Sequence, residues 1–313
     1  MKEPRGQELI NRYRRNYKIA ADAVVTEAMV LTHWDLERRL TRELLTSKPA
    51  DRWQVFERCY STLYTELAWL NESVDSRLQS PPNQRYANWL DVIGSSPRRI
   101  YEIGSGKAEL ISWLATLGHD CKATEITRER GGKHAAGAAN LAWGVSDGVH
   151  LDRFEERESY DIVISNQVVE HLHPDDLIDH FAGVKAILAP GGSYILSTPH
   201  AWYGPWDISK VFKRAAPLGM HLQEYTYREL RDALRAAGFA DIRAIMKREN
   251  EVNSKQRPFA TASCRYLRYQ CLVELALSRV PRTIFQRRLT KACQAIGFSS
   301  DIFLMARQGS ARS

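Results

Sequence analysis

The chain has 313 residues, an ordinary hydrophobic content of 44% and a net charge of +7 at pH 7, enough length for one large or two modest domains. It contains no apolar run near the ~18–20 residues of a membrane span, and its polar start lacks the apolar stretch of a secretion signal. The five cysteines are scattered, which argues against a disulfide framework or a zinc site. We therefore expect a cytoplasmic globular protein without a resident metal.

The first eighty residues predict helices. Apolar residues recur at spacings of three and four over residues 10–44, until Ser47-Lys48-Pro49 interrupts the pattern. Asp51 is a candidate cap for a second helix, whose apolar positions continue to Leu70. Because Pro81-Pro82 separates this segment from the rest of the chain, we expect an N-terminal helical cap over residues 1–82.

Short apolar strands then alternate with helices, the pattern of an α/β domain over residues 83–313. The expected strands are 99–103, 120–126, 141–145, 160–165, 192–198, 242–247 and 301–306. Intervening helices make the first five strands parallel and place a ligand at their carboxyl ends, near the point where strand order reverses. We therefore predict a doubly wound, mostly parallel, seven-stranded Rossmann-like sheet.

Local signals place the helices between these strands. Pro174-Asp175-Asp176 suits a helix start, Pro190-Gly191-Gly192 a helix stop, and Thr226 the cap of a helix over 227–237. A helical insertion over about 253–298 precedes the last strand. It carries nine basic residues against Glu274 alone, so it could bind an anionic substrate, a lipid surface or nothing.

The most informative segment is R-I-Y-E-I-G-S-G-K-A at residues 99–108. A strand containing Glu102 runs into a turn at Gly104-Ser105-Gly106, where small residues let backbone N–H groups approach a ligand. Glu125 ends the next strand and suits a ribose diol, because a carboxylate accepts from two hydroxyl groups. The pattern predicts an adenosine-containing ligand. A dinucleotide is disfavoured, because its fingerprint needs a third glycine where the chain has Glu109.

This E-I-G-S-G run resembles the first motif of class I S-adenosylmethionine-dependent methyltransferases, usually (Asp/Glu)-x-Gly-x-Gly-x-Gly. The chain departs from that motif at its final glycine, which is Ala108. Two later runs also resemble the family. They are Y-D-I-V-I-S-N-Q-V-V-E-H-L over 160–172 and A-I-L-A-P-G-G-S-Y-I-L-S-T over 186–198, which correspond to the fourth and fifth strands with the helix between them. The resemblance covers roughly residues 85–250.

The resemblance implies S-adenosylmethionine as cofactor. Glu102 and the turn would face its methionyl part, Glu125 its ribose, Asp147 its adenine, and Asn166 and Gln167 its sulfonium. The full set of expected cofactor residues is Glu102, Gly104, Ser105, Gly106, Glu125, Ile126, Asp147, Gly148, Asn166 and Gln167. A turn residue and a strand-end cap are the structural alternatives for Asp147 and Asn166.

Glu170 and His171 are the candidate catalytic residues, because they follow strand four, close to where a bound methyl group would point. Either could act as a general base. The structural alternative is that both order the loop. His173 reads as a helix-entry residue.

The loop after strand five, T-P-H-A-W-Y-G-P-W-D-I, contains His200, Trp202, Tyr203 and Trp206. Aromatic faces beside a sulfonium can line an apolar acceptor pocket and stabilise positive charge. Tyr13 and Tyr17 on the first helix complete the expected substrate residues. Packing against the N-terminal helices is the alternative for the loop. His200 and Asp207 form a weak metal pair, and the cations around Tyr13 could hold a phosphate.

Three classes of function remain open. The first is methylation of a small, largely apolar acceptor, with C-methylation of a prenyl diphosphate favoured and Glu170 as proton acceptor. Such a substrate could bring Mg²⁺. An O- or N-methyltransferase of a small metabolite or lipid is the alternative chemistry. The second class modifies RNA or a membrane-surface substrate docked by the basic insertion, with nucleic acid ranked low because no binding motif accompanies the charge. The third is a non-catalytic cofactor-binding protein.

Overall fold

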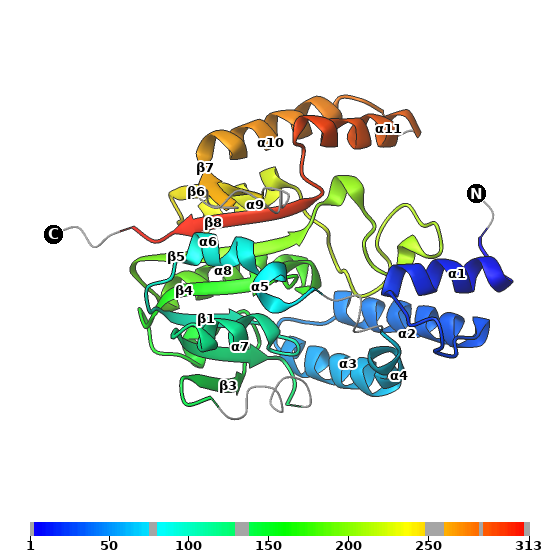
Figure 1. Ribbon diagram of the computed structural model, residues 1–313, viewed down its shortest axis with the longest axis horizontal. Coiled ribbons are helices and arrows are strands. Elements are labelled where there is room, and N and C mark those ends of the chain that lie inside the picture. The colour runs from blue at the N-terminus through cyan, green and yellow to red at the C-terminus, as the bar shows by residue number, and fades with distance from the viewer. Residues whose placement is uncertain (1–2, 75–79, 129–137, 248–259, 282–283, 310–313) are drawn as a thin grey trace. The chain divides into compact units, whose positions relative to one another are not determined.

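The computed structural model describes residues 3–74, 80–128, 138–247, 260–281 and 284–309 (Figure 1). Contacts divide the chain into two compact units. The helical unit comprises residues 1–80, 170–174 and 204–224, and the sheet unit comprises 81–169, 175–203 and 225–313. No helix among the described residues is both long enough and apolar enough to cross a membrane.

The helical unit contains α1 (Gly6–Tyr17), α2 (Glu27–Leu45), α3 (Arg52–Glu66) and α4 (Ala68–Ser73). The single periodic run expected over residues 10–44 is wrong, because α1 and α2 are separate helices. Lys18 takes a left-handed conformation at φ 51° and ends α1, and the Thr26 side chain caps α2 by accepting from Met29 N. Asp51 lies at the N-cap of α3 but makes no side-chain capping bond.

Two later segments of the chain belong to the helical unit. Ile208, Val211 and Phe212 are buried in the same apolar cluster as residues of α1 and α2. The Trp34 and Phe212 rings stack at 4.5 Å between centroids. The N-terminal helices therefore complete their core with a segment that follows the fifth strand, which the sequence analysis did not include.

The sheet unit contains an eight-stranded sheet of order β3-β2-β1-β4-β5-β8-β6-β7, visible as a stack of strands in Figure 1. Its strands are β1 (Arg99–Ile103), β2 (Asp120–Glu125), β3 (Leu141–Val145), β4 (Tyr160–Asn166), β5 (Leu188–Pro199), β6 (Asp241–Lys247), β7 (Ala260–Ser263) and β8 (Asp301–Arg307). The first five strands are parallel, and β8 is antiparallel to both β5 and β6. Strand order reverses between β1 and β4, so the doubly wound Rossmann-like prediction is confirmed.

The strand count differs from the seven expected. The additional strand, β7, pairs antiparallel with β6 at the sheet edge. It is the four-residue stretch A-T-A-S, too short to show the alternation that identifies a strand in sequence. A second correction concerns α8, which ends at Ile187 rather than at Pro190, because β5 already begins at Leu188.

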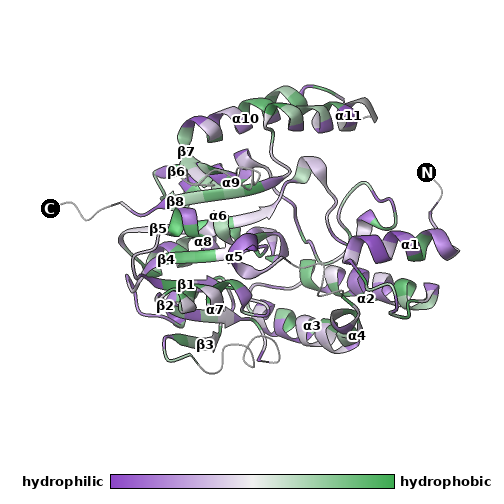
Figure 2. Ribbon diagram, viewed as in Figure 1, coloured by the Kyte–Doolittle hydropathy of each residue, from purple (hydrophilic) through white to green (hydrophobic). Residues whose placement is uncertain are grey.

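Helices lie between and beyond these strands. They are α5 (Pro82–Arg85), α6 (Ala87–Ile93), α7 (Glu109–Thr116), α8 (Leu177–Ile187), α9 (Tyr227–Ala236), α10 (Cys264–Ser278) and α11 (Ile284–Cys293), with short 3-10 turns at Leu151–Arg153, Val169–His171, Pro174–Asp176, Ala201–Tyr203, Ile208–Lys210 and Gln294–Ile296. Figure 2 shows the largely hydrophobic central strands. Thr226 caps α9 in a reciprocal capping box with Glu229, as predicted.

The basic insertion forms α10 and α11, which contact each other and lie beyond β7 in Figure 1. Buried Glu274 of α10 accepts hydrogen bonds from Tyr227 N at 2.6 Å and Arg228 N at 3.1 Å, which tie α10 to the start of α9. The exposed cations of these helices include Arg265, Arg268, Arg279, Arg288 and Lys291. Lys255, Arg257 and Arg282 lie outside the described residues.

Gly183 of α8 is a close-packing point beside the loop that follows β3. A Cβ atom at this position would lie 2.1 Å from the backbone oxygen of Val149. We expect Gly183→Ala to lower the free energy of unfolding by about 1–3 kcal/mol, because helix and loop must separate to admit the methyl group. Urea denaturation measures the change, with Ala182→Ser on the exposed face of α8 as control. Equal stability of the two variants would contradict this packing.

Candidate functional site

The turn after β1 is built from left-handed residues. Gly104 and Gly106 have φ of +63° and +58°, and Ala108 takes φ 55° where the family motif has its third glycine. A Cβ atom on Gly104 would lie 2.8 Å from Val168 Cγ2, so this position has neither the space nor the conformation for a side chain. The turn brings backbone N–H groups to the carboxyl end of β1, where α7 begins.

Glu125 joins this turn to the end of β2. Its carboxylate accepts from Gly106 N at 2.5 Å and from Ile126 N at 3.3 Å. Ser105 N donates to Thr124 O at 2.9 Å, which adds a second link between the turn and β2. The cofactor residues predicted on β1 and β2 are thus brought together at one edge of the sheet.

Glu102 is buried with only 2% of its surface exposed. Its Oε2 atom has no hydrogen-bond partner among the described residues. Burial, followed by the negative charge of nearby Glu125, raises the pKa of Glu102 to about 8. An orphaned acid of this kind fits a ligand that brings an ammonium group, as the methionyl part of S-adenosylmethionine does.

Asp147 lies in the loop after β3 and organises that loop. Its Oδ1 accepts from Val149 N and His150 N, both at 2.8 Å, while Oδ2 lies 2.9 Å from His150 Nδ1. Gly148 follows at φ 71°. The side chain thus makes the turn contacts of the structural alternative. A carboxylate has about four acceptor positions, so an adenine contact stays a prediction.

Asn166 and Gln167 are fixed at the end of β4 by the neighbouring strand β5. Ser197 Oγ donates to Asn166 Oδ1 at 2.6 Å, and Gln167 N donates to Ser197 O at 2.8 Å. Gln167 takes φ 60°, which turns the chain out of the strand. Both residues belong to the same sheet edge as the β1 turn.

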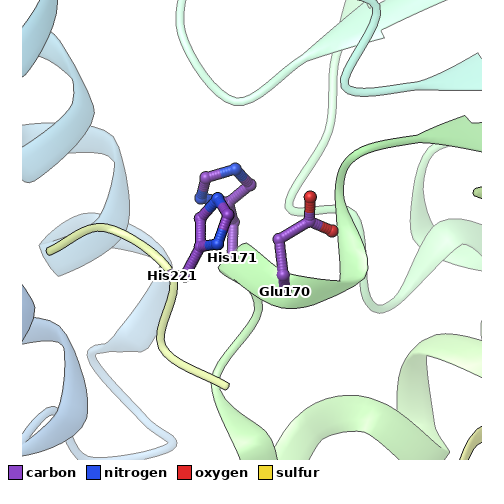
Figure 3. Close-up of side chains that lie close together, drawn as sticks. All are labelled: Glu170, His171 and His221. Carbon is purple, nitrogen blue, oxygen red and sulfur yellow. The ribbon is translucent and has the colours of Figure 1, made fainter. Parts of the chain in front are cut away.

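Glu170, His171 and His221 form a compact polar cluster within the helical unit (Figure 3). One ligand-type atom from each residue lies within 4.8 Å of the others, and Glu170 is fully buried. The two imidazole rings meet edge to face at 4.9 Å between centroids. Burial lowers the pKa of His221, but hydrogen bonding to Glu224 and the charge of Glu170 outweigh it, so that pKa is raised.

The segment that carries His221 is held by hydrogen bonds on both sides. Asp207 accepts from Gly219 N at 2.6 Å, and Glu37 of α2 accepts from Met220 N at 3.2 Å. On the other side, Glu170 O accepts from Leu222 N at 2.8 Å and from Gln223 N at 3.2 Å. The backbone N–H groups on both sides of His221 are therefore held by hydrogen bonds.

Tyr13 and Tyr17, predicted to contact substrate, belong to the interior of the helical unit. Tyr13 OH lies 2.6 Å from His33 Nδ1, and His33 Nε2 lies 2.7 Å from Glu37 Oε1. Burial raises the pKa of Tyr13, so its phenol stays neutral. Tyr17 packs beside Tyr13 at 4.6 Å between ring centroids. Through His33, Tyr13 is connected to Glu37, whose carboxylate accepts from Met220 N next to His221.

The predicted aromatic acceptor loop has contacts of several kinds. His200 is fully buried, with Nε2 2.8 Å from Glu274 Oε1 and Nδ1 2.9 Å from Ser299 O. Tyr203 OH donates to Thr290 O and Phe298 O, both at 3.1 Å. Most of these partners lie in the helical insertion, whereas the packing alternative predicts contacts with the N-terminal helices. Trp202 and Trp206 are half-buried, and the Lys210 ammonium lies 4.3 Å from the Trp206 ring centroid.

The sequence analysis missed His221, Glu224 and Glu37. His221 lies fifty residues after His171, in a stretch without regular secondary structure, so no motif spacing connects the two. The weak metal pair of His200 and Asp207 is replaced by other contacts. His200 bonds Glu274, and Asp207 accepts from the backbone of Ser209, Leu218 and Gly219.

The family comparison agrees with this geometry. A profile of the protein family described as a methyltransferase domain matches residues 75–244. This span covers more than half of the chain, and the chain belongs to that family. A search of curated protein sequences finds no match.

The fold is similar to that of solved methyltransferases. One is 1,6-didemethyltoxoflavin-N1-methyltransferase from Burkholderia thailandensis, with a TM-score of 0.50 and 14% identity over 84% of this chain and 92% of that chain. Another is a SAM-dependent methyltransferase from Archaeoglobus fulgidus, with a TM-score of 0.49 and 15% identity over 80% of this chain and 99% of that chain. At such low identity the likeness concerns the fold alone.

The buried acid Glu102 gives a pH-dependent prediction. Its pKa is about 8 in the folded protein against 4.5 as the reference value, so the folded state keeps a proton that the unfolded state loses. This contribution to stability is complete below about pH 4.5 and is lost as pH rises through about 8. Because Gln stays neutral, we expect Glu102→Gln to gain stability relative to the original chain as pH rises across this window.

Urea denaturation at several pH values between these limits measures the effect. Glu156→Gln at an exposed position is the matched control. Parallel pH profiles for the original chain and Glu102→Gln would contradict a raised pKa at Glu102.

Proposed function

We propose that this methyltransferase uses S-adenosylmethionine and transfers its methyl group to an oxygen or nitrogen atom of a small acceptor. The observation that carries the cofactor assignment is the partnerless buried oxygen of Glu102, beside a left-handed turn that Glu125 closes. Glu102 would take the ammonium group, the turn the carboxylate and Glu125 the ribose. The set also includes Asp147 and Asn166 at the ends of the two neighbouring strands.

The reaction is an in-line displacement. A bond forms between the methyl carbon and the acceptor heteroatom, while the carbon–sulfur bond breaks and leaves its electron pair on sulfur as S-adenosylhomocysteine. A hydroxyl acceptor must also lose its proton. The protein supplies alignment and a group that makes the heteroatom nucleophilic.

Glu170 and His171 are our candidates for that activation, together with His221. Glu170 lies four positions after Asn166 in the chain. The cluster combines a buried carboxylate with two imidazoles, which suits the removal of a proton from a heteroatom. It includes the two residues that the sequence analysis named as catalytic.

C-methylation of a prenyl diphosphate, the acceptor favoured on sequence, has less support. That chemistry needs cations for the diphosphate, and two of the arginines of α1 have other contacts. Arg12 donates to Val211 O and Lys210 O, both at 2.6 Å, and Arg14 donates to backbone oxygens of residues 20, 21 and 23. Tyr203, one of its proposed aromatic groups, packs against the insertion. The polar cluster favours a heteroatom acceptor instead.

A macromolecular or membrane-surface substrate is the second candidate. The exposed cations of α10 and α11 support it, because such a block attracts polyanions. Steep loss of methyl transfer with rising salt would favour this candidate. Activity on small acceptors that is insensitive to salt would favour our first proposal.

Replacement of Glu125 tests the cofactor assignment. We expect Glu125→Gln to weaken S-adenosylmethionine binding about 10-fold to 100-fold, because the charged acceptor for the ribose and the turn is lost. Isothermal titration calorimetry measures the affinity. Asp120→Asn, at the exposed opposite end of β2, is the matched control. Failure of the original chain to bind S-adenosylmethionine or S-adenosylhomocysteine would overturn the proposal.

The acceptor is found by incubation of the protein with methyl-labelled S-adenosylmethionine. The panel contains phenols, hydroxy acids and amines, with geranyl and farnesyl diphosphate as the contrasting class. Labelled product from a hydroxyl or amine compound supports our proposal. Product from the prenyl diphosphates alone would restore the C-methylation hypothesis.

A further inference from the structure

We propose that Glu170, His171 and His221 bind a divalent transition-metal ion through one carboxylate oxygen and the Nε2 atom of each imidazole. The three side chains come from two segments fifty residues apart and converge within the helical unit (Figure 3). Their ligand-type atoms lie within 4.8 Å of one another. Metal–ligand bonds of ~2.0–2.2 Å require ligands ~3–4 Å apart, a spacing that small side-chain rotations reach.

The hydrogen bonds of the two imidazoles match those of metal ligands. A ligating histidine usually donates its second ring N–H to a carbonyl or carboxylate, which fixes the tautomer. His171 Nδ1 lies 2.9 Å from Met220 O, and His221 Nδ1 lies 2.9 Å from Glu224 Oε1. With Nδ1 protonated, each neutral ring carries its lone pair on Nε2, the atom that a metal needs.

The surrounding backbone positions both rings. Met220 N donates to the Glu37 carboxylate, and Met220 O lies within hydrogen-bond distance of His171 Nδ1. Met220 therefore connects α2 to the cluster. Thr41 Oγ1 donates to Gly219 O in the same segment. Glu224 also accepts from Trp206 N at 2.6 Å, which fixes the carboxylate that holds His221. A loop pinned in this way can hold ligands at a set spacing before the ion arrives.

The ligand set indicates the kind of ion. Two imidazoles with one carboxylate suit Zn²⁺, Co²⁺ or Fe²⁺, whereas Mg²⁺ and Ca²⁺ prefer oxygen ligands. Three protein ligands leave a coordination position for a water molecule or an acceptor oxygen. We assign the site to a Zn²⁺-like ion with this open position.

The role of the ion, unlike its binding, rests on the proposed function. An acceptor hydroxyl on the metal would have a lowered pKa and release its proton to water, leaving an oxygen nucleophile for the methyl group. Glu170 and His171 would then activate the acceptor as ligands rather than as free bases.

Cobalt binding tests the site directly. The full chain is freed of metal with a chelator, and Co²⁺ is added while visible absorption is followed. We expect one equivalent with bands typical of nitrogen and oxygen ligands, displaced by Zn²⁺ and not by Mg²⁺. His221→Gln and Glu170→Gln should remove this binding.

Glu224→Gln is the second variant, because it keeps all three ligands and changes the carboxylate that contacts His221 and Trp206 N. We expect it to weaken Co²⁺ binding about 10-fold to 100-fold, and it serves if a ligand variant fails to fold. His150→Gln and Cys264→Ser are controls at partly exposed or exposed positions and should bind as the original chain does.

Three outcomes would overturn the inference: no Co²⁺ binding by the original chain, binding unchanged by His221→Gln and Glu224→Gln, or the near-ultraviolet bands of cobalt thiolate. The cofactor titration is run separately on the chelated protein. Cobalt binding without S-adenosylmethionine binding would overturn the proposed function alone, and the reverse would overturn the metal site alone.

Discussion

The turn after β1 depends on the hydrogen bond between Gly106 N and the Glu125 carboxylate. This bond holds a turn whose residues occupy a region of backbone space that only small side chains tolerate, so it fixes both the direction of the turn and the entry of the chain into α7. It also places Glu125 beside Glu102. Two carboxylates at one end of the sheet repel each other, and Oε2 of buried Glu102 has no hydrogen-bond partner among the described residues. Burial, followed by the negative charge of Glu125, raises the pKa of Glu102 to about 8, which suits a cationic ligand that would take the place of the proton.

The second polar centre is the cluster of Glu170, His171 and His221, and its surroundings differ from those of Glu102. At Glu102 one carboxylate oxygen lacks a hydrogen-bond partner among the described residues, whereas around His221 five of the six backbone N–H groups from Leu218 to Gln223 donate hydrogen bonds. Buried polar networks rigidify a structure when all members are satisfied. In the helical unit α1 and α2 perform this task, since Tyr13, His33 and Glu37 form a chain of hydrogen bonds that ends at Met220. Tyr13 is therefore linked through His33 and Glu37 to the segment that carries His221.

The sequence predicts the first centre well and the second only in part. The conformation of a turn at a strand end depends on consecutive residues. The E-I-G-S-G run therefore predicts the turn after β1, and the carboxylate that ends the next strand predicts a polar group beside it. The parallel sheet follows from the alternation of apolar strands with helices. By contrast, His221 reaches His171 through tertiary folding of a segment without regular structure, and no spacing encodes that approach. The same holds for His200 and Tyr203, whose contacts are with an insertion that lies seventy or more residues further along the chain.

Glu170 contributes both to the polar cluster and to the backbone hydrogen bonds that support it. Its side chain belongs to the polar cluster, while its backbone oxygen accepts from Leu222 N and Gln223 N and so positions the segment that carries His221. Four residues earlier the same stretch of chain ends β4 at Asn166, which Ser197 holds against β5. A replacement that removed only the Glu170 carboxylate would leave these backbone bonds in place. A substitution at Glu170 can therefore change the polar cluster and leave the backbone hydrogen bonds intact. It tests the function of the carboxylate more specifically than a deletion of the loop would.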